Sequence, residues 1–126
     1  MIIDNVKLKN GETKRYQRKI IFLFAIEIVG LYKVLAERKE FVLSKQVLRS
    51  GTSIGANIRE AEHAQSKADF IHKLSISLKE ANETEYWLDL LYETKYINQI
   101  EFENIKPKII ELLKLLTSII NTSKSK

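Results

Sequence analysis

Apolar residues recur with a period near 3.6 in four stretches of this chain, the spacing that places them on one face of an α-helix. The pattern predicts helices over residues 14–37, 44–64, 66–95 and 98–122. The periodic positions of the first stretch are Ile20, Phe24, Ile28, Leu31 and Leu35, and those of the last are Ile105, Ile109, Leu112, Leu116 and Ile119. We therefore expect an all-α protein.

The first predicted helix carries apolar residues around nearly its whole circumference. Off its main stripe lie Ile21, Phe22, Leu23, Ile26 and Val29. A helix that is apolar on nearly every face is buried on nearly every face. Because a small bundle covers one face only, we expect the second face to contact another subunit.

Three candidate caps agree with the starts of the other helices: Ser44, Ser66 with Asp69, and Asn98 with Glu101. Pro107 lies about two turns into the fourth predicted helix. Proline lacks the N–H that an interior turn needs and clashes with the preceding turn. We expect it to kink or break that helix.

The connections between these helices are short, and the chain has only four glycines and one proline. Short connections make successive helices antiparallel, which predicts an up-down-up-down four-helix bundle. We place the bundle at residues 14–122, with a flexible basic segment at 1–13 and a basic tail at 123–126.

Composition narrows the class of protein. The chain contains no cysteine, which rules out disulfides and thiolate metal sites. The most apolar segment, residues 20–32, is interrupted by Glu27 and is shorter than the roughly 20 residues of a membrane span. The first residues do not resemble a signal peptide. We expect a cytoplasmic protein that does not bind a membrane.

The net charge of +5 is unevenly distributed. Residues 1–19 contain six basic and two acidic side chains, whereas residues 60–101 contain four basic and nine acidic ones. Basic ends favour a surface that binds the phosphates of RNA or DNA. The candidate contacts are Lys7, Lys9, Lys14, Arg15, Arg18, Lys19, Lys106, Lys108, Lys124 and Lys126. Much of this charge is also compatible with an ordinary solvated helix surface.

Two glycines, Gly51 and Gly55, lie one turn apart inside the second predicted helix. Their G-x-x-x-G spacing follows no strand and precedes no lysine, so it does not match a nucleotide-binding loop. Each interior glycine costs a helix about 1 kcal/mol relative to alanine. We expect the close approach of another helix to compensate for that cost.

Beside the glycines, a polar stripe borders the apolar face of the second predicted helix. Polar groups next to a core need hydrogen-bond partners, and the third predicted helix supplies them if it runs antiparallel. We expect a network that sets helix register or subunit contacts. Its candidate members are Gln46, Arg49, Ser50, Thr52, Ser53, Asn57, Glu60, Glu80, Glu83, Thr84 and Trp87.

Three catalytic readings have weak support. Glu60 and His63 match the E-x-x-H spacing of di-iron bundles, but matching carboxylates on the other helices lie at different levels along the axis. Arg59 and His63 are too close together for a small helical RNase motif. No serine near a histidine has a visible oxyanion site. We expect no enzyme activity, no cofactor and no metal.

The stretch from Leu43 to Ala61 reads L-x-x-Q-x-x-R-S-x-T-S-I-x-A-N-I-x-E-A, and a second motif, S-x-x-D-F followed by K-E-A-x-E-T-x-Y-W-L, covers Ser66 to Leu88. In both motifs the chain resembles the four-helix-bundle family of 23S rRNA-intervening-sequence proteins. The resemblance covers nearly the whole chain, although Pro107 lies outside the motifs.

The resemblance implies a ring-like homopentamer. It also implies a relationship to the accessory protein of diversity-generating retroelements, which is a basic pentamer that binds nucleic acid and a reverse transcriptase. The function of the family itself is not established. From the sequence we therefore expect a homo-oligomer that binds nucleic acid, with a protein-recruiting scaffold as the alternative.

Overall fold

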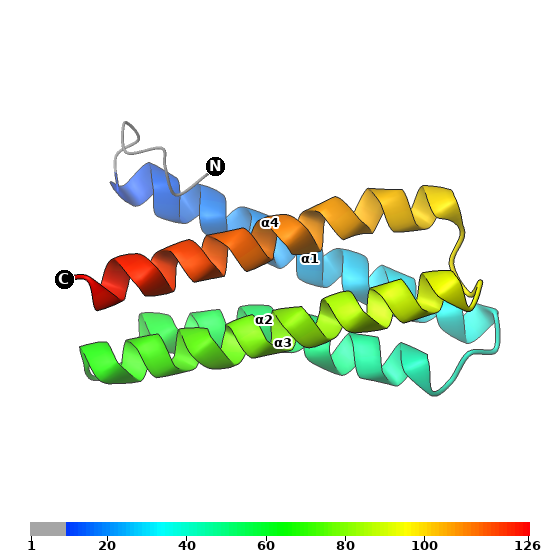
Figure 1. Ribbon diagram of the computed structural model, residues 1–126, viewed down its shortest axis with the longest axis horizontal. Helices are drawn as coiled ribbons and strands as arrows, with labels where there is room; N and C mark the ends of the chain where they lie inside the picture. The colour runs from blue at the N-terminus through cyan, green and yellow to red at the C-terminus, as the bar shows by residue number, and fades with distance from the viewer. Residues whose placement is uncertain (1–9) are drawn as a thin grey trace.

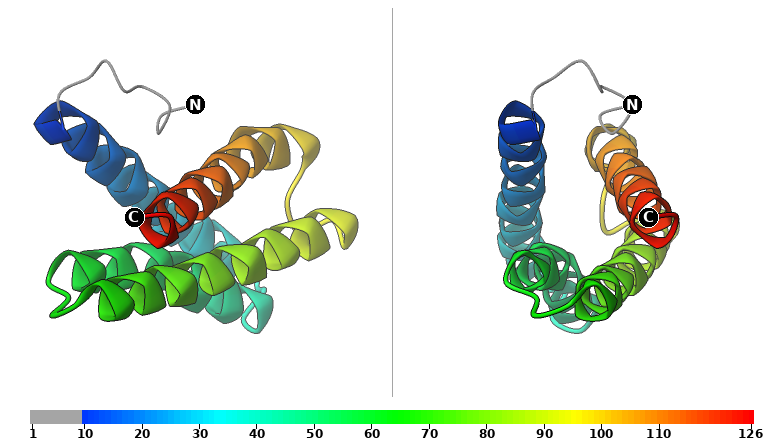
Figure 2. Two further views of the ribbon diagram at one scale, coloured as in Figure 1. Left: turned by 60° about the vertical axis from the view of Figure 1, so that its left-hand side comes forward. Right: turned by 90° about the vertical axis from the view of Figure 1, so that its left-hand side faces the viewer.

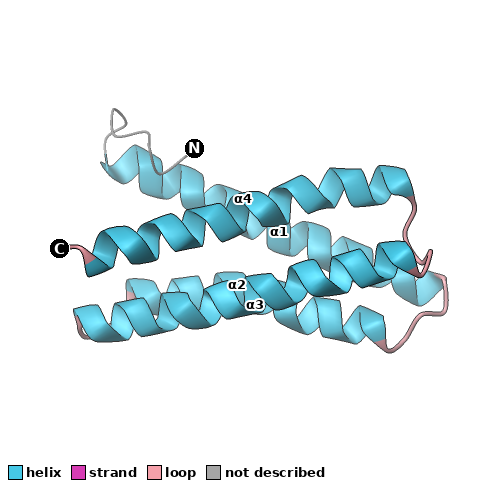
Figure 3. Ribbon diagram, viewed as in Figure 1, coloured by secondary structure: helices cyan, strands magenta, loops and turns pink. Residues whose placement is uncertain are grey.

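Four α-helices make up the protein, and the computed structural model describes residues 10–126, with side chains from Thr13 onward. The helices are α1 (Asn10–Glu37), α2 (Leu43–Glu62), α3 (Lys67–Glu93) and α4 (Gln99–Lys124). No strand occurs among these residues (Figures 1 and 3). The prediction of an all-α, four-helix protein is confirmed.

The helix ends differ from prediction by a few residues. Helix α1 begins at Asn10, four residues before its predicted start, because the turn from Asn10 to Thr13 contains no apolar residue that could signal it. Helix α4 continues to Lys124, two residues beyond the predicted end. Frayed helix ends carry little sequence signal.

Successive helices run antiparallel, and their apolar stripes meet in one core (Figure 1). Every helix contributes fully buried side chains to it. The largest of them are Ile28, Leu35, Ile54, Leu74, Leu88, Leu91, Ile97, Ile109, Leu115 and Leu116. The up-down-up-down topology follows from the short connections, as predicted.

The neighbouring helices of the bundle do not all pack equally closely. Helix α2 packs against α1 and α3, and α3 packs against α4, whereas α1 and α4 contact each other least. Figure 2 shows α1 and α4 standing apart above the α2–α3 pair. The start of α1 and the end of α4 lie at the same end of the bundle (Figure 1).

Two of the three predicted caps form. The Asn98 side chain accepts the Glu101 N–H at 2.8 Å, and the Glu101 carboxylate accepts the Asn98 N–H at 2.9 Å, which completes a capping box. The Ser66 hydroxyl accepts the Asp69 N–H at 3.1 Å. Asp69 does not return the bond to Ser66 but accepts the N–H of Gln65 at 3.4 Å.

The predicted cap at Ser44 is wrong. Helix α2 begins one residue earlier, its N-cap residue is Val42, and that residue has no capping side chain. The buried Glu40 carboxylate accepts the Ser44 N–H at 2.6 Å, which satisfies a free donor of the first turn. Ser44 itself is buried, and its hydroxyl has no partner among the described residues.

Helices α1 and α3 are each followed, two residues after the last helical residue, by a lysine whose backbone is in the left-handed region. Lys39 has φ 64° and Lys95 has φ 68°. In each case the next residue donates back to the helix, Glu40 to the Leu35 carbonyl and Tyr96 to the Leu91 carbonyl, both at 2.9 Å. This Schellman geometry usually uses glycine, so periodicity and composition did not indicate it.

Pro107 does not break α4. The helix continues through it, and both Pro107 and Glu103, whose carbonyl loses its intrahelical donor, are exposed. Water can solvate that carbonyl, which reduces the cost of the missing bond. Among residues 10–126, no helix combines the length and the apolar character that crossing a membrane requires.

Candidate interaction surfaces

Gly51 leaves no room for a side chain between α2 and Ile28 of α1. A Cβ at this position would lie 2.8 Å from Cγ2 and 2.9 Å from Cγ1 of Ile28, whose side chain is fully buried. Cβ atoms in proteins do not come this close to other heavy atoms. Ile28 cannot move aside to make room, because its side chain is branched at Cβ and therefore rigid. The predicted role of Gly51, a close helix–helix approach, is confirmed.

The other glycines of the helices behave differently. A Cβ at Gly55 would lie 3.2 Å from Cγ2 of Ile21, a tight contact that small adjustments can relieve. Gly30, in the middle of α1, has nothing within 4 Å of such a Cβ. The packing within this subunit therefore explains Gly51, partly explains Gly55, and gives no reason for Gly30.

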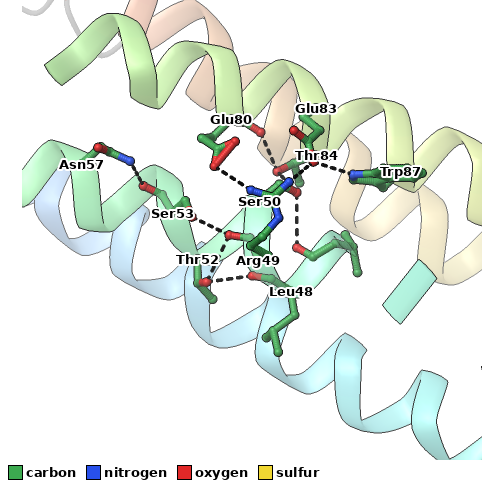
Figure 4. Close-up of polar contacts among 11 residues, drawn as sticks. Leu48, Arg49, Ser50, Thr52, Ser53, Asn57, Glu80, Glu83, Thr84 and Trp87 are labelled. Atoms are coloured by element: carbon green, nitrogen blue, oxygen red, sulfur yellow. Dashed lines mark hydrogen bonds and ion pairs between the residues drawn. The ribbon is translucent and has the colours of Figure 1, made fainter. Parts of the chain in front are cut away.

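Arg49 links α2 to α3 through charge. Its guanidinium donates to the Glu80 carboxylate at 3.3 Å and to Oε2 of Glu83 (Figure 4). The Trp87 indole N–H donates to the same Glu83 oxygen at 2.9 Å. The polar stripe of α2 thus finds the partners that the sequence predicted on α3.

A buried pair of hydroxyls lies beneath this ion-pair cluster. Thr84 donates to the Ser50 hydroxyl at 2.9 Å, and both residues are fully buried. Ser77 donates to the Ile54 carbonyl at 2.8 Å, again from α3 to α2. Ser77 is not among the predicted network members. Its position between Leu74 and Ala81 on an apolar stripe was the one sign in the sequence that it is buried and needs a hydrogen-bond partner.

The remaining members of the predicted network do not all bridge helices. Thr52, Ser53 and Asn57 donate to carbonyls one turn earlier in α2 (Figure 4). Glu60 does reach α3, where the Lys73 ammonium donates to it at 3.1 Å. The last predicted member, Gln46, is exposed.

One end of the bundle gathers basic side chains from several helices. The start of α1, the start of α3 and the end of α4 lie at that end (Figure 1). The Lys67 ammonium donates to the main-chain oxygen of Lys126 at 2.7 Å, which shows how close the last two are. We call the exposed residues Lys14, Arg15, Lys19, Lys124 and Lys126 the basic end.

Three predicted phosphate contacts form ion pairs inside the subunit. Arg18 pairs with Glu62 at 2.8 Å, and Lys108 pairs with Glu27 at 2.7 Å. Lys106 pairs with a carboxylate on α3, Glu85, at 3.1 Å, and with Asp89. Lys7 and Lys9 lie outside the residues that the structure describes.

Partial burial disfavours the charge of Lys106. Hydrogen bonds to Asp89 and Glu85 outweigh that effect and raise the pKa of Lys106 above its ordinary value. Its ammonium is therefore charged and already occupied. The exposed residues of the basic end have no ion partner among residues 13–126, so their charges are not used within the subunit.

Helix α1 also exposes apolar side chains that the core does not use. Leu23, Ile26 and Val29 are 47%, 51% and 37% exposed, and Gly30 lies beside them. We call these four residues the outer stripe. A second exposed apolar group lies at the opposite end of the bundle from the basic end: Phe41 and Val42 in the connection between α1 and α2, and Ile100 in the first turn of α4.

The histidines do not assemble a reactive site. His63 and His72 are both exposed. Within the part of the chain that the structure describes, no three histidine or acidic side chains are placed to hold a metal ion.

Comparisons with known proteins agree with this geometry. The model of the family described as 23S rRNA-intervening sequence protein matches residues 15–118. The chain belongs to this family. The match includes all of α2 and α3, and hence the Arg49–Glu83 cluster and the buried hydroxyl pair.

A solved structure has the same fold. It is the 1.70 Å crystal structure of a protein of unknown function from the S23 ribosomal protein family of Bacteroides thetaiotaomicron VPI-5482. The two sequences are 63% identical, the alignment covers 82% of this chain and 96% of that one, and the TM-score is 0.80. The chain matches no curated protein.

Proposed function

We propose that this member of the family is a non-enzymatic homo-oligomer that binds RNA or DNA through the basic end of its bundle. The observation that carries the proposal is the position of the five exposed cations of the basic end. They come from both termini of the bundle, lie at one end of the molecule and have no carboxylate partner among the described side chains.

Assembly is supported by the outer stripe of α1. Leu23, Ile26 and Val29 form an apolar surface that one subunit leaves in water, and such surfaces mark contacts with other molecules. Gly30 adds an independent argument, because its cost to the helix of about 1 kcal/mol has no compensation within the subunit. A close neighbour from outside would supply that compensation.

The family resemblance implies that the assembly is a pentameric ring. It also implies a relationship to the accessory protein of diversity-generating retroelements, and we include both in the proposal. A ring repeats the basic end five times around its axis. Repetition strengthens weak contacts with a long polyanion, since each further contact is intramolecular. Such binding is non-specific, because phosphate contacts carry no sequence information.

The test is size-exclusion chromatography with light scattering, repeated with a pool of RNA and DNA at about 50 and 200 mM salt. We expect an oligomer that co-elutes with nucleic acid at the lower salt and releases it at the higher. The triple variant Lys14→Gln, Arg15→Gln, Lys19→Gln should assemble normally and lose nucleic acid. A monomer, or an oligomer that ignores nucleic acid at low salt, would refute the corresponding half of the proposal.

One observation favours the alternative of a protein-recruiting scaffold. Phe41, Val42 and Ile100 are 56%, 69% and 80% exposed at the end of the bundle that lacks the basic cluster. Exposed apolar residues of this size suit a protein partner better than a phosphate backbone. If the oligomer does not bind nucleic acid, these exposed apolar residues become the better candidates for the binding surface, with a protein as the partner.

A further inference from the structure

A groove lies between α1 and α2, next to the basic half of α1. Its volume is about 260 Å³. Phe22 lies along its α1 side, Arg59 along its α2 side and Arg18 near its end, and Gly55 and Ala56 are among the small residues between them. Ile21 and Ile58 also line it. The groove thus combines an aromatic ring, two guanidinium groups and an apolar lining.

Phe22 is the most exposed aromatic residue in the helices of this protein, at 61%. The core does not need it, and it lies apart from the outer stripe. Leu23 and Ile26 line a separate cavity of about 390 Å³ on the α4 side of α1, whereas Phe22 lines the groove on the α2 side. An exposed ring in this place offers a flat apolar face to an outside molecule.

Cations surround that ring. Arg18 and Lys19 precede Phe22 by four and three residues, and Arg15 by seven, so all three are its neighbours on the surface of α1. The carboxylate in the groove, that of Glu62, is paired with Arg18 at 2.8 Å. Arg59 has no ion partner among the described side chains. The groove therefore favours an occupant that is both planar and anionic.

We propose that this groove binds an unstacked base of a single-stranded nucleic acid. The base lies against Phe22, and the flanking phosphates contact Arg59 and the cations of α1. A duplex keeps its bases inside the helix and has no free face for Phe22, so a single strand gains a contact that a duplex lacks. The inference rests on the proposed nucleic-acid binding and names its substrate class.

The experiment measures the fluorescence anisotropy of labelled oligouridylate and oligothymidylate of about 12 nucleotides, and of a duplex of the same length, at one low salt concentration. Both single strands should bind more tightly than the duplex. Phe22→Ala should weaken single-strand binding about tenfold, which is within the effect of losing one stacked base, and should leave duplex binding unchanged. Phe22→Trp should retain binding, and bound bases should quench its fluorescence.

Phe41→Ala is the matched control, because Phe41 is 56% exposed but lies at the other end of the bundle. It should change neither affinity. Arg59→Gln should weaken binding and reduce the slope of log K against log salt by about 0.7 for a single strand. Light scattering on each variant checks that assembly is unchanged.

The possible outcomes separate this inference from the proposed function. Equal affinity for single strand and duplex, with Phe22→Ala without effect, overturns the groove and leaves binding by the basic end intact. If Phe22→Ala changes the assembly and weakens binding of single strand and duplex equally, Phe22 is a subunit contact, and the proposed base-binding groove is refuted as well. No binding of any nucleic acid overturns the proposed function itself.

Discussion

A glycine-to-alanine substitution should have opposite effects at two positions of this bundle. At Gly30 the new methyl group meets nothing within 4 Å. The helix then gains the full preference for alanine, about 1 kcal/mol. We expect Gly30→Ala to raise the free energy of unfolding of the isolated subunit by about that amount.

At Gly51 the same methyl group would lie 2.8 and 2.9 Å from two carbons of Ile28. Overpacking of a rigid core costs about 1–3 kcal/mol, which exceeds the gain in helix preference. We expect Gly51→Ala to lower the free energy of unfolding by about 1 kcal/mol. The two variants should therefore differ by about 2 kcal/mol, although the chemical change is identical.

The assay is urea unfolding followed by circular dichroism and by the fluorescence of Trp87, the one tryptophan of the chain. All variants are compared at one protein concentration at which light scattering shows a monomer, because assembly contributes to apparent stability and the subunit contact proposed at Gly30 would oppose the gain. Unchanged m-values show that stability alone has changed. Gly55→Ala, with its contact of 3.2 Å, should fall between the other two.

A double-mutant cycle identifies the clash. Ile28→Ala alone should cost about 2–5 kcal/mol, because it opens a cavity. Combined with Gly51→Ala, it should cost less than the two single effects together, since the carbons that meet the new methyl group are gone. If Gly51→Ala stabilised the protein as much as Gly30→Ala does, the close α1–α2 approach would be refuted.

Three further predictions concern caps, the buried hydroxyls and pH. Lys95→Gly should stabilise the protein by about 0.5–1 kcal/mol in urea unfolding, because φ 68° strains a lysine and suits glycine. Ser50→Ala and Thr84→Val should each cost about 1–2 kcal/mol, and the double variant should cost less than their sum, since each single variant already removes the one bond between the two hydroxyls. The hydrogen bond from Arg38 holds the pKa of Glu101 below its ordinary value, partial burial opposing it. The pKa of Glu101 is therefore lower in the folded protein than in the unfolded chain. The stability that its ionised carboxylate contributes is fully present above about pH 4.3 and is lost as pH falls through the folded pKa. The difference in unfolding free energy between wild type and Glu101→Gln should therefore shrink from pH 6 to about pH 3.

Controls keep these tests specific. Lys79→Gly, in the middle of α3, should destabilise by about 1 kcal/mol, the opposite of Lys95→Gly. A Ser50–Thr84 cycle with strictly additive costs would contradict a direct bond between the hydroxyls. A flat profile for Glu101→Gln would contradict the assigned pKa shift.

The sequence by itself determined the four helices, their inward stripes and the capping box at Asn98. Each of these features is encoded within a few residues, since a helix period and a cap involve neighbours in the chain. The sequence also indicated that the polar stripe of α2 finds partners on α3, because antiparallel packing makes the two helices face each other, but it did not say which residue pairs with which.

Only the tertiary structure decided how distant residues pair. It showed that Gly51 meets Ile28, that the Lys108 charge is used by Glu27, and that the Glu40 carboxylate, not the Ser44 hydroxyl, accepts a free N–H in the first turn of α2. It also showed that α1 and α4 pack less closely than the other neighbouring helices. These outcomes depend on how far each helix slides and tilts against the next, and such long-range registers leave no periodic trace in the chain.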